Sequence, residues 1–217
     1  MSAASLSQKN RITGGLVDRD QPLGFRFDGQ HYTGFAGDTL ASALLANDVR
    51  LVGRSFKYHR PRGILTAGSE EPNALVTIGD GAFQDPNSRA TTAQLFNGMN
   101  AKSQTKMGLL SFDLMAINDF LSPLLGAGFY YKTFMWPAAF WEKIYEPIIR
   151  KAAGLGSLSG LADPDQYDKG YLHCDLLVIG SGPSGLMAAL AAAKSGLQII
   201  LADEDVCLGR RLSAERR

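Results

Sequence analysis

Apolar and polar positions alternate near the start of the chain, where Leu23, Phe25 and Phe27 are the apolar members. A second apolar stretch follows with Tyr32 and Phe35. A period of two is typical of a strand with one buried face. The Asp28-Gly29 pair between the two stretches favours a tight turn, because glycine readily adopts positive φ. We therefore expect a β-hairpin over residues 22 to 35.

A short helix is predicted directly after the hairpin. Asp38 or Thr39 can accept hydrogen bonds from the free N–H groups of a first helical turn. The apolar residues that follow share one helical face: Leu40, Ala43 and Leu44. Asn47 and Asp48 are expected to end the helix.

Two further extended segments complete this first part of the chain. Val49 to Val52 follow the helix, and Ala74 to Ile78 precede a turn at Asp80-Gly81. The order strand, turn, strand, helix, strand predicts a small α+β domain that wraps a sheet around one helix. We assign residues 10–90 to it.

Residues 91–171 are predicted to be a connecting segment, because glycines and prolines interrupt every pattern in it. It carries a block of aromatic residues: Phe129, Tyr130, Tyr131, Phe134, Trp136, Phe140, Trp141 and Tyr145. Charged residues within the block exclude a membrane span. Two interpretations stay open, a segment packed on a core and a contact surface for a partner chain.

Residues 172–217 begin with a pattern typical of dinucleotide-binding proteins. A buried-strand run, Asp175 to Ile179, is followed at once by the glycine loop GSGPSG. An alanine-rich helix from Leu186 to Ser195 and a strand from Gln198 to Ala202 come next. This order predicts the first βαβ unit of a Rossmann-type FAD/NAD-binding domain. Because such a sheet needs more strands, the chain is expected to be a fragment.

The glycine loop has the chemistry of a pyrophosphate site. Gly180 permits the tight turn, Gly182 allows close approach of the ligand, and Gly185 allows the helix to pack on the strand. Free N–H groups at the helix start then favour an anion. Asp203 is placed to bind a ribose 2′-OH, which favours FAD or NAD over NADP. The candidate cofactor-binding residues are Gly180, Ser181, Gly182, Pro183, Ser184, Gly185, Asp203 and Glu204. The alternative is that these glycines only form a turn between a strand and a helix and bind no ligand.

Composition excludes several classes of protein. The net charge is +1, from 22 basic and 21 acidic residues, so neither nucleic acid nor an anionic membrane is expected as a partner. The N-terminus lacks the apolar run of a signal peptide, and two cysteines are too few for a disulfide framework or a structural zinc site. We expect a cytoplasmic protein with no metal site.

The basic segment 54–62, which includes His59, does not indicate one particular binding or catalytic site. Arg54, Lys57, Arg60 and Arg62 form either a solvated, salt-bridged surface or a clamp for a cofactor phosphate or a partner subunit. His59 has no visible acid partner in the sequence, so it is assigned no catalytic role.

Four long motifs together resemble one enzyme family. They are GDTLASALLAND, GRSFKYHRPRGILTAGSEEPNALVTI, GFYYKTFMWP with the following WEKIYEPIIRKAAGLG, and CDLLVIGSGPSGLMAAL. From about residue 10 to residue 213 the chain is similar to the N-terminal part of the α subunits of heterotetrameric sarcosine oxidases. Opine oxidases and hydrogen cyanide synthase share parts of the pattern and remain alternatives.

The resemblance implies a ferredoxin-like β-grasp domain in the first part of the chain. Cluster-bearing relatives carry cysteines spaced C-x4-C-x2-C in the loop before a strand, and Thr66, Glu71 and Ala74 stand at that spacing. We therefore expect no iron–sulfur cluster. We also expect Glu70 and Glu71 to form ion pairs with Arg60 or Arg62.

The resemblance also implies the function of the whole enzyme. Such enzymes demethylate sarcosine oxidatively to glycine, and yield hydrogen peroxide together with formaldehyde or methylene-tetrahydrofolate. NAD is expected in the dinucleotide domain of this subunit, FAD on the β subunit, FMN between the α and β subunits, and folate in the full-length subunit. The resemblance further implies that the chain has no catalytic residue of its own. The β, γ and δ subunits are the expected partners. An electron-transfer iron–sulfur subunit and a non-catalytic assembly module are the rival classes.

Overall fold

A computed structural model describes residues 8–12, 14–128, 136–204 and 208–209. The chain forms two compact units, residues 1–163 and residues 164–217. The division falls inside the predicted connecting segment, before its expected end at residue 171.

The first unit is built on a five-stranded mixed sheet in the order β2-β1-β7-β5-β6. β1 and β7 pair in parallel, and the other neighbours pair antiparallel. The strands are β1 (Asp18–Phe27), β2 (Gln30–Ala36), β5 (Leu75–Ile78), β6 (Asp85–Arg89) and β7 (Asn100–Ser103). The predicted α+β class is therefore confirmed. The predicted domain end at residue 90 is wrong, because β7 lies between β1 and β5 in the middle of the sheet.

The predicted hairpin is confirmed. Phe27 pairs with Gln30 across the turn, and Asp28 and Gly29 have φ values of 48° and 82°. Positive φ at both central residues matches the twist of the two strands.

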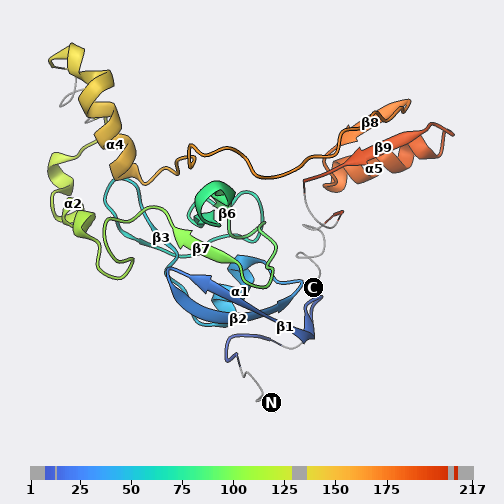
Figure 1. Cartoon of the computed structure of the whole chain (residues 1–217), viewed down its shortest axis with the longest axis horizontal. Helices are drawn as coiled ribbons and strands as arrows, with labels where there is room; N and C mark the ends of the chain where they lie inside the picture. Colours follow the sequence, from blue (N-terminus) through green and yellow to red (C-terminus); the bar gives the residue numbers. More distant parts are fainter. Residues whose placement is uncertain (1–7, 13, 129–135, 205–207, 210–217) are drawn as a thin grey trace. The chain divides into compact units, whose positions relative to one another are not determined.

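Helix α1 (Leu40–Ala46) packs on the sheet and supplies Leu40, Ala41, Ala43 and Leu44 to the core. Figure 1 shows it against the β1–β2 part of the sheet. Thr39 is its N-cap and forms a reciprocal capping box with Ser42, and Asn47 ends it. The largest apolar side chains of the core are Phe25, Phe27, Leu40, Leu44, Val52, Val76, Leu95 and Met99.

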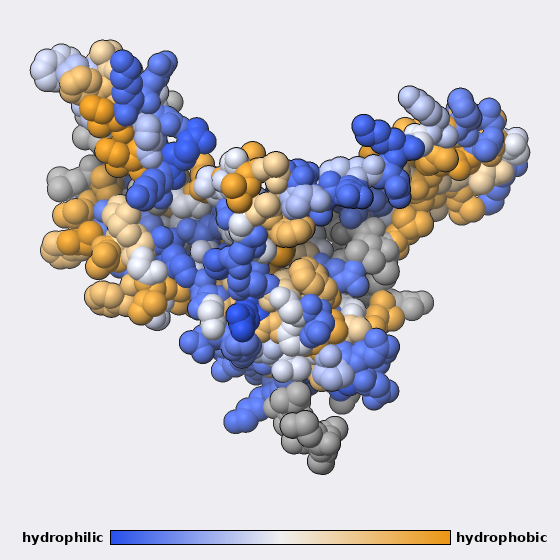
Figure 2. Space-filling view, viewed as in Figure 1, coloured by the Kyte–Doolittle hydropathy of each residue, from blue (hydrophilic) through white to orange (hydrophobic). Residues whose placement is uncertain are grey.

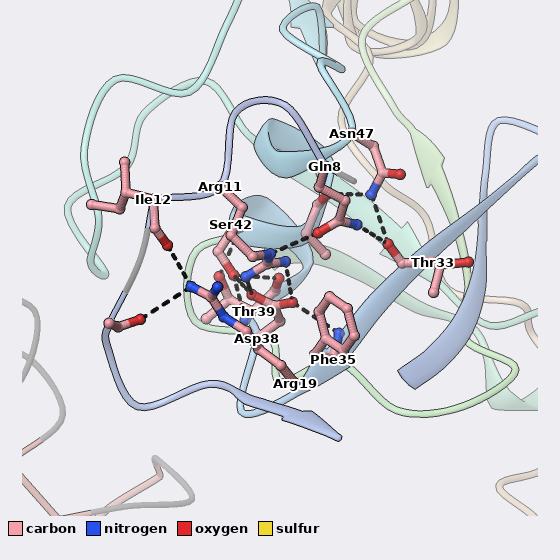
Figure 3. A network of polar contacts seen from close by, with 12 residues as sticks. Gln8, Arg11, Ile12, Arg19, Thr33, Phe35, Asp38, Thr39, Ser42 and Asn47 are labelled. Atoms are coloured by element: carbon pink, nitrogen blue, oxygen red, sulfur yellow. Dashed lines mark hydrogen bonds and ion pairs between the residues drawn. The ribbon is translucent and has the colours of Figure 1, made fainter. Parts of the chain in front are cut away.

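Asp38 forms a buried polar network next to this cap instead of capping the helix itself (Figure 3). Its carboxylate accepts two hydrogen bonds from Arg11, at 3.0 and 2.6 Å, one from the backbone N–H of Phe35 and one from the hydroxyl of Ser42. Arg11 also lies over the Phe35 ring. The network fastens the N-terminal segment to the start of α1.

Val49 to Val52 do not form the expected strand. The N–H of Val49 donates to the carbonyl of Leu44 in the last turn of α1, and the N–H of Val52 donates to the backbone carbonyl of Arg62. Regular pairing starts only at β3 (Gly53–Arg54), which forms a short antiparallel ladder with β4 (Pro61–Arg62). The end of α1 therefore takes the N–H of Val49, whereas Val52 already bonds to β4, the strand that pairs with β3.

The rest of the first unit consists of short helical turns and one longer helix. These elements are η1 (Gly81–Phe83), η2 (Leu114–Ala116), α2 (Ile117–Phe120), η3 (Ser122–Leu124), η4 (Ala138–Phe140), η5 (Trp141–Tyr145) and α4 (Glu146–Ala153). Gly154 ends α4 with φ 68°. Residues 129–135, which include half of the aromatic block, lie outside the described part of the chain.

Large apolar side chains are exposed along residues 107–128 and 136–161, which are together called here the outer segment. They include Leu109, Phe112, Leu114, Ile117, Phe120, Trp136, Ile148, Leu155, Leu158 and Leu161. Figure 2 shows hydrophobic atoms gathered over α2 and α4. These two elements thus present apolar surface outward.

The second unit contains a parallel strand–helix–strand unit. β8 (Leu176–Ile179) pairs with β9 (Ile199–Ala202), and α5 (Pro183–Ala193) connects them. The predicted order of elements is confirmed, although the helix begins at Pro183 and not at Leu186. Proline suits a first helical position because it has no N–H to satisfy. Across the described ranges of both units, no helix is long and apolar enough to cross a membrane.

Candidate functional site

The glycine loop joins the end of β8 to the start of α5 by a tight turn. Gly180 has φ 98°, in the left-handed region that favours glycine. Its N–H bonds to the carbonyl of Ala202 at the end of β9, at 2.7 Å. Gly182 is the N-cap of α5, and Pro183 and Ser184 lie exposed in the first turn. The loop therefore begins where the two parallel strands end.

The second and third glycines of the motif meet very different surroundings. A Cβ added at Gly185 would lie 1.9 Å from the carbonyl oxygen of Gly180, so no larger residue fits without a shift of the backbone. A Cβ added at Gly182 would meet no atom of the described part of the chain within 4 Å. Gly185 thus allows the helix to approach the strand, whereas Gly182 borders open space.

Asp203 and the glycine loop lie together. The backbone N–H of Ser181 donates to Oδ2 of Asp203, and the hydroxyl oxygen of Ser181 accepts a hydrogen bond from the N–H of Gly209 at 3.0 Å. Ser181 is buried, whereas Glu204 is exposed. The six predicted loop residues from Gly180 to Gly185 thus share one end of the βαβ unit with Asp203, and Glu204 lies next to Asp203 on the surface.

The electrostatics of this end favour an anion beside hydroxyl groups. Among the residues that the structure describes, no side chain caps the first turn of α5, so its N–H groups and the partial positive charge of the helix start face no capping group there. A carboxylate has about four lone-pair sites. Asp203 accepts the N–H of Ser181, and its carboxylate is the type of group that binds ribose hydroxyls.

Two protein families match the chain. Residues 20–106 match the 2Fe-2S iron-sulfur cluster binding domain, and residues 175–216 match the FAD dependent oxidoreductase family. The first match covers the sheet and α1, and the second covers the βαβ unit with its glycine loop.

Whole-chain relatives agree with these matches. The chain is 62% identical over 201 residues to the sarcosine oxidase subunit alpha of Rhizobium meliloti (strain 1021), across 93% of its own length. The chain is similar to part of sarcosine oxidase subunit alpha over nearly its whole length. The subunit alpha of Corynebacterium sp. (strain U-96) is 37% identical over 197 residues, which is 89% of this chain. The resemblance inferred from the four motifs is confirmed.

The similarity covers only a part of these relatives. The chain spans 20% of the Rhizobium subunit and 15% of the Corynebacterium subunit. Among solved structures, the crystal structure of L-proline dehydrogenase from P. horikoshii is 19% identical to the chain. It matches 88% of this chain and 26% of its own, with a TM-score of 0.44, a likeness that supports no inference.

The loop before β5 holds Glu71 in an unexpected way. For Glu71 the predicted ion pair with Arg60 or Arg62 is wrong, because its buried carboxylate accepts backbone N–H groups of its own loop. Burial opposes ionisation of Glu71, but hydrogen bonds from Thr66, Asn73 and Leu65 outweigh it and hold its pKa below the ordinary value of 4.5. Arg60 bonds instead to Asp119, at 2.6 Å.

The structure also overturns the expectation that His59 lacks an acid partner. His59 is buried, and its Nδ1 lies 3.0 Å from Oδ2 of Asp113. Burial opposes ionisation of Asp113, but hydrogen bonds from His59 and from the N–H groups of Met107 and Met115 keep its pKa below the ordinary value of 3.8. The two residues are 54 positions apart, and no local motif signals their contact.

The basic segment serves mainly to hold the outer segment. Arg54 donates to the carbonyls of Leu110 and Ser111, and Lys57 donates to the carbonyl of Gly126. These contacts favour the intramolecular interpretation over a phosphate clamp.

Proposed function

We propose that this chain is part of an α-type subunit of a sarcosine oxidase. The enzyme would demethylate sarcosine oxidatively to glycine, with formaldehyde or methylene-tetrahydrofolate and hydrogen peroxide as the other products. The identity of 62% over 93% of the chain supports this proposal most strongly. Residues for amine oxidation, the FAD and FMN sites and a folate site would lie outside this chain.

The substrate is tested with the complex that contains this chain. Purified complex should produce hydrogen peroxide with sarcosine faster than with an opine or with glycine. A preference for an opine would transfer the assignment to the opine oxidases, and cyanide from glycine would transfer it to hydrogen cyanide synthase. The names of the matching relatives do not favour either alternative.

Within the complex, the βαβ unit would hold a dinucleotide with a free ribose 2′-OH. The N–H groups at the start of α5 would bind the pyrophosphate, and Asp203 would accept the ribose hydroxyls. A 2′-phosphate next to this carboxylate would be repelled. NAD is the proposed ligand, and FAD is the alternative that the match to the FAD dependent oxidoreductase family favours.

The two inner glycines provide a matched test of this site. Gly182→Ala adds a methyl group where no described atom lies within 4 Å, so the stability should fall by less than about 1 kcal/mol, the cost of alanine at an N-cap. The same methyl group would occupy the position where the backbone approaches a pyrophosphate, so the affinity for NAD should fall by roughly tenfold or more. Gly185→Ala should lower both stability and affinity, because its Cβ meets the carbonyl of Gly180.

Calorimetric titration of the complex with NAD and FAD, together with thermal unfolding, measures both properties. A loss of NAD affinity in Gly182→Ala at unchanged stability supports the site. Equal affinity in wild type and Gly182→Ala would instead mean that the loop is a turn with incidental glycines. Tighter binding of FAD than of NAD would identify FAD as the ligand, and the loop would still be a dinucleotide-binding site.

The outer segment is the proposed docking surface for the β, γ or δ subunits. Its apolar side chains are exposed, with Phe120 at 86% and Trp136 at 84%. Aromatic residues are enriched in the buried centre of protein interfaces, and the outer segment is fastened to β3 and the following turn through Arg54 and Lys57. A docked subunit would cover this surface.

Surface substitutions test the docking surface. Phe120→Ser and Trp136→Ser should reduce the amount of other subunits that co-purify with this chain. Phe83→Ser is the control, because Phe83 is also exposed but lies in η1, outside the outer segment. If all three variants retain the other subunits equally, the outer segment is not the contact.

A further inference from the structure

The loop between β4 and β5 is arranged around one carboxylate. Oε2 of Glu71 accepts the N–H groups of Leu65 at 2.8 Å and Thr66 at 2.6 Å, and Oε1 accepts the N–H of Asn73 at 2.8 Å. The hydroxyl of Thr66 lies 3.3 Å from Oε2. Glu71 is only 2% exposed. Three backbone amides of one loop thus converge on a buried negative charge.

Converging backbone N–H groups form an anion-binding concavity of the kind found in phosphate and iron–sulfur sites. Such a concavity is stable only when an acceptor fills it, because an unpaired buried N–H group costs about 1–3 kcal/mol. In this loop the acceptor belongs to the chain itself.

The side chains of this loop do not fit the 2Fe-2S cluster after which the matching domain family is named. A [2Fe–2S] cluster takes four cysteine thiolates, and residues 20–106, which match that family, contain no cysteine. Ala74 offers a buried methyl group, and the oxygens of Glu71 already bond to the loop. Thr91 reaches the loop from outside and donates to the carbonyl of Gly68 at 2.7 Å. No group of three or more possible metal-binding side chains occurs in the described ranges.

The geometry points to Glu71 as the internal replacement for a cluster: its carboxylate is the anion that orders the loop, so the domain keeps the loop without iron. This inference extends the proposed absence of a cluster by naming what occupies its place. A hydrogen bond to an ionised acceptor is roughly twice as strong as a neutral one. Glu71 therefore does more than fill space, because its charge holds three amides in one geometry.

The test compares Glu71→Gln with Glu70→Gln in the full chain by site-resolved amide hydrogen exchange. Both variants remove one carboxylate charge, but Glu70 is exposed. In Glu71→Gln, exchange at Leu65, Thr66 and Asn73 should accelerate by roughly tenfold or more. In Glu70→Gln it should stay at the wild-type rate. Equal protection in Glu71→Gln and wild type would overturn the role of Glu71.

Two measurements on the wild type remain decisive if Glu71→Gln does not fold. The amide of Leu65 should exchange slowly although Leu65 is 73% exposed, because that amide bonds to Glu71; fast exchange would refute the inference. Anaerobic treatment with iron and sulfide should leave the protein colourless, without stoichiometric iron. Iron bound at one cluster per chain would overturn both the inference and the proposed absence of a cluster, whereas fast exchange without iron would overturn the inference alone.

Discussion

The Arg11–Asp38 network allows a quantitative prediction about the first unit. Asp38 is fully buried, and its two oxygens accept four hydrogen bonds, two of them from Arg11. Asp38→Asn keeps the shape but places an NH2 group against donors and leaves the Arg11 charge without its partner (Figure 3). Removing one partner of a buried ion pair costs about 3–5 kcal/mol. Because domains are stable by about 5–15 kcal/mol, this variant should lose a large fraction of its stability.

Urea unfolding followed by far-UV circular dichroism measures this loss. Asp38→Asn should unfold at a clearly lower urea concentration than the wild type. Asp48→Asn is the matched control, because the Asp48–Arg50 pair is exposed on both sides and exposed pairs often contribute nothing measurable. The double variant Arg11→Met/Asp38→Asn should recover part of the loss, since it no longer contains an unpaired buried charge. A loss below about 1 kcal/mol in Asp38→Asn would refute the reasoning.

Three further predictions concern the site and the pH dependence. Asp203→Asn should weaken NAD binding by roughly tenfold to a hundredfold and should reduce the ratio of NAD affinity to NADP affinity. Glu204→Gln should change neither the NAD affinity nor this ratio much. Titration of each variant with NAD and with NADP measures both quantities. Gly185→Ala should lower the melting temperature of the second unit, because overpacking costs about 1–3 kcal/mol; an unchanged value would contradict the close approach to Gly180. The pKa of Asp113 in the folded state lies below its ordinary value of 3.8. The ionised carboxylate therefore stabilises the fold fully above pH 3.8, and this stabilisation is lost as the pH falls below 3.8 through the pKa of the folded state. The stability difference between wild type and Asp113→Asn should therefore shrink between about pH 5 and pH 2, and a constant difference would contradict the shift.

Features encoded within a few residues could be predicted from the sequence. The turn at Asp28-Gly29, the cap of α1 at Thr39 and the glycine loop after β8 each depend on neighbours in the chain. Turn chemistry, capping and glycine spacing are local, so a single sequence carries their signal.

Features that depend on distant partners could not be predicted. β7 joins the centre of the sheet although no strong alternation marks it, because its place is decided by pairing with β1 and β5. Glu71 was expected to pair with arginines, whereas it bonds to the backbone of its own loop, a choice that depends on the fold of that loop. The His59–Asp113 pair joins segments far apart in sequence. Contacts between residues far apart in the chain produce no periodic pattern in the sequence.

The nucleotide content of the purified complex tests the central claim most directly. The complex that contains this chain is denatured, and the released cofactors are separated and identified by liquid chromatography and mass spectrometry. The account predicts about one NAD per copy of this chain, and its loss in Gly182→Ala while the flavins remain. A complex that releases flavins but no NAD, in wild type and variant alike, would contradict the assignment of NAD to the loop from Gly180 to Gly185.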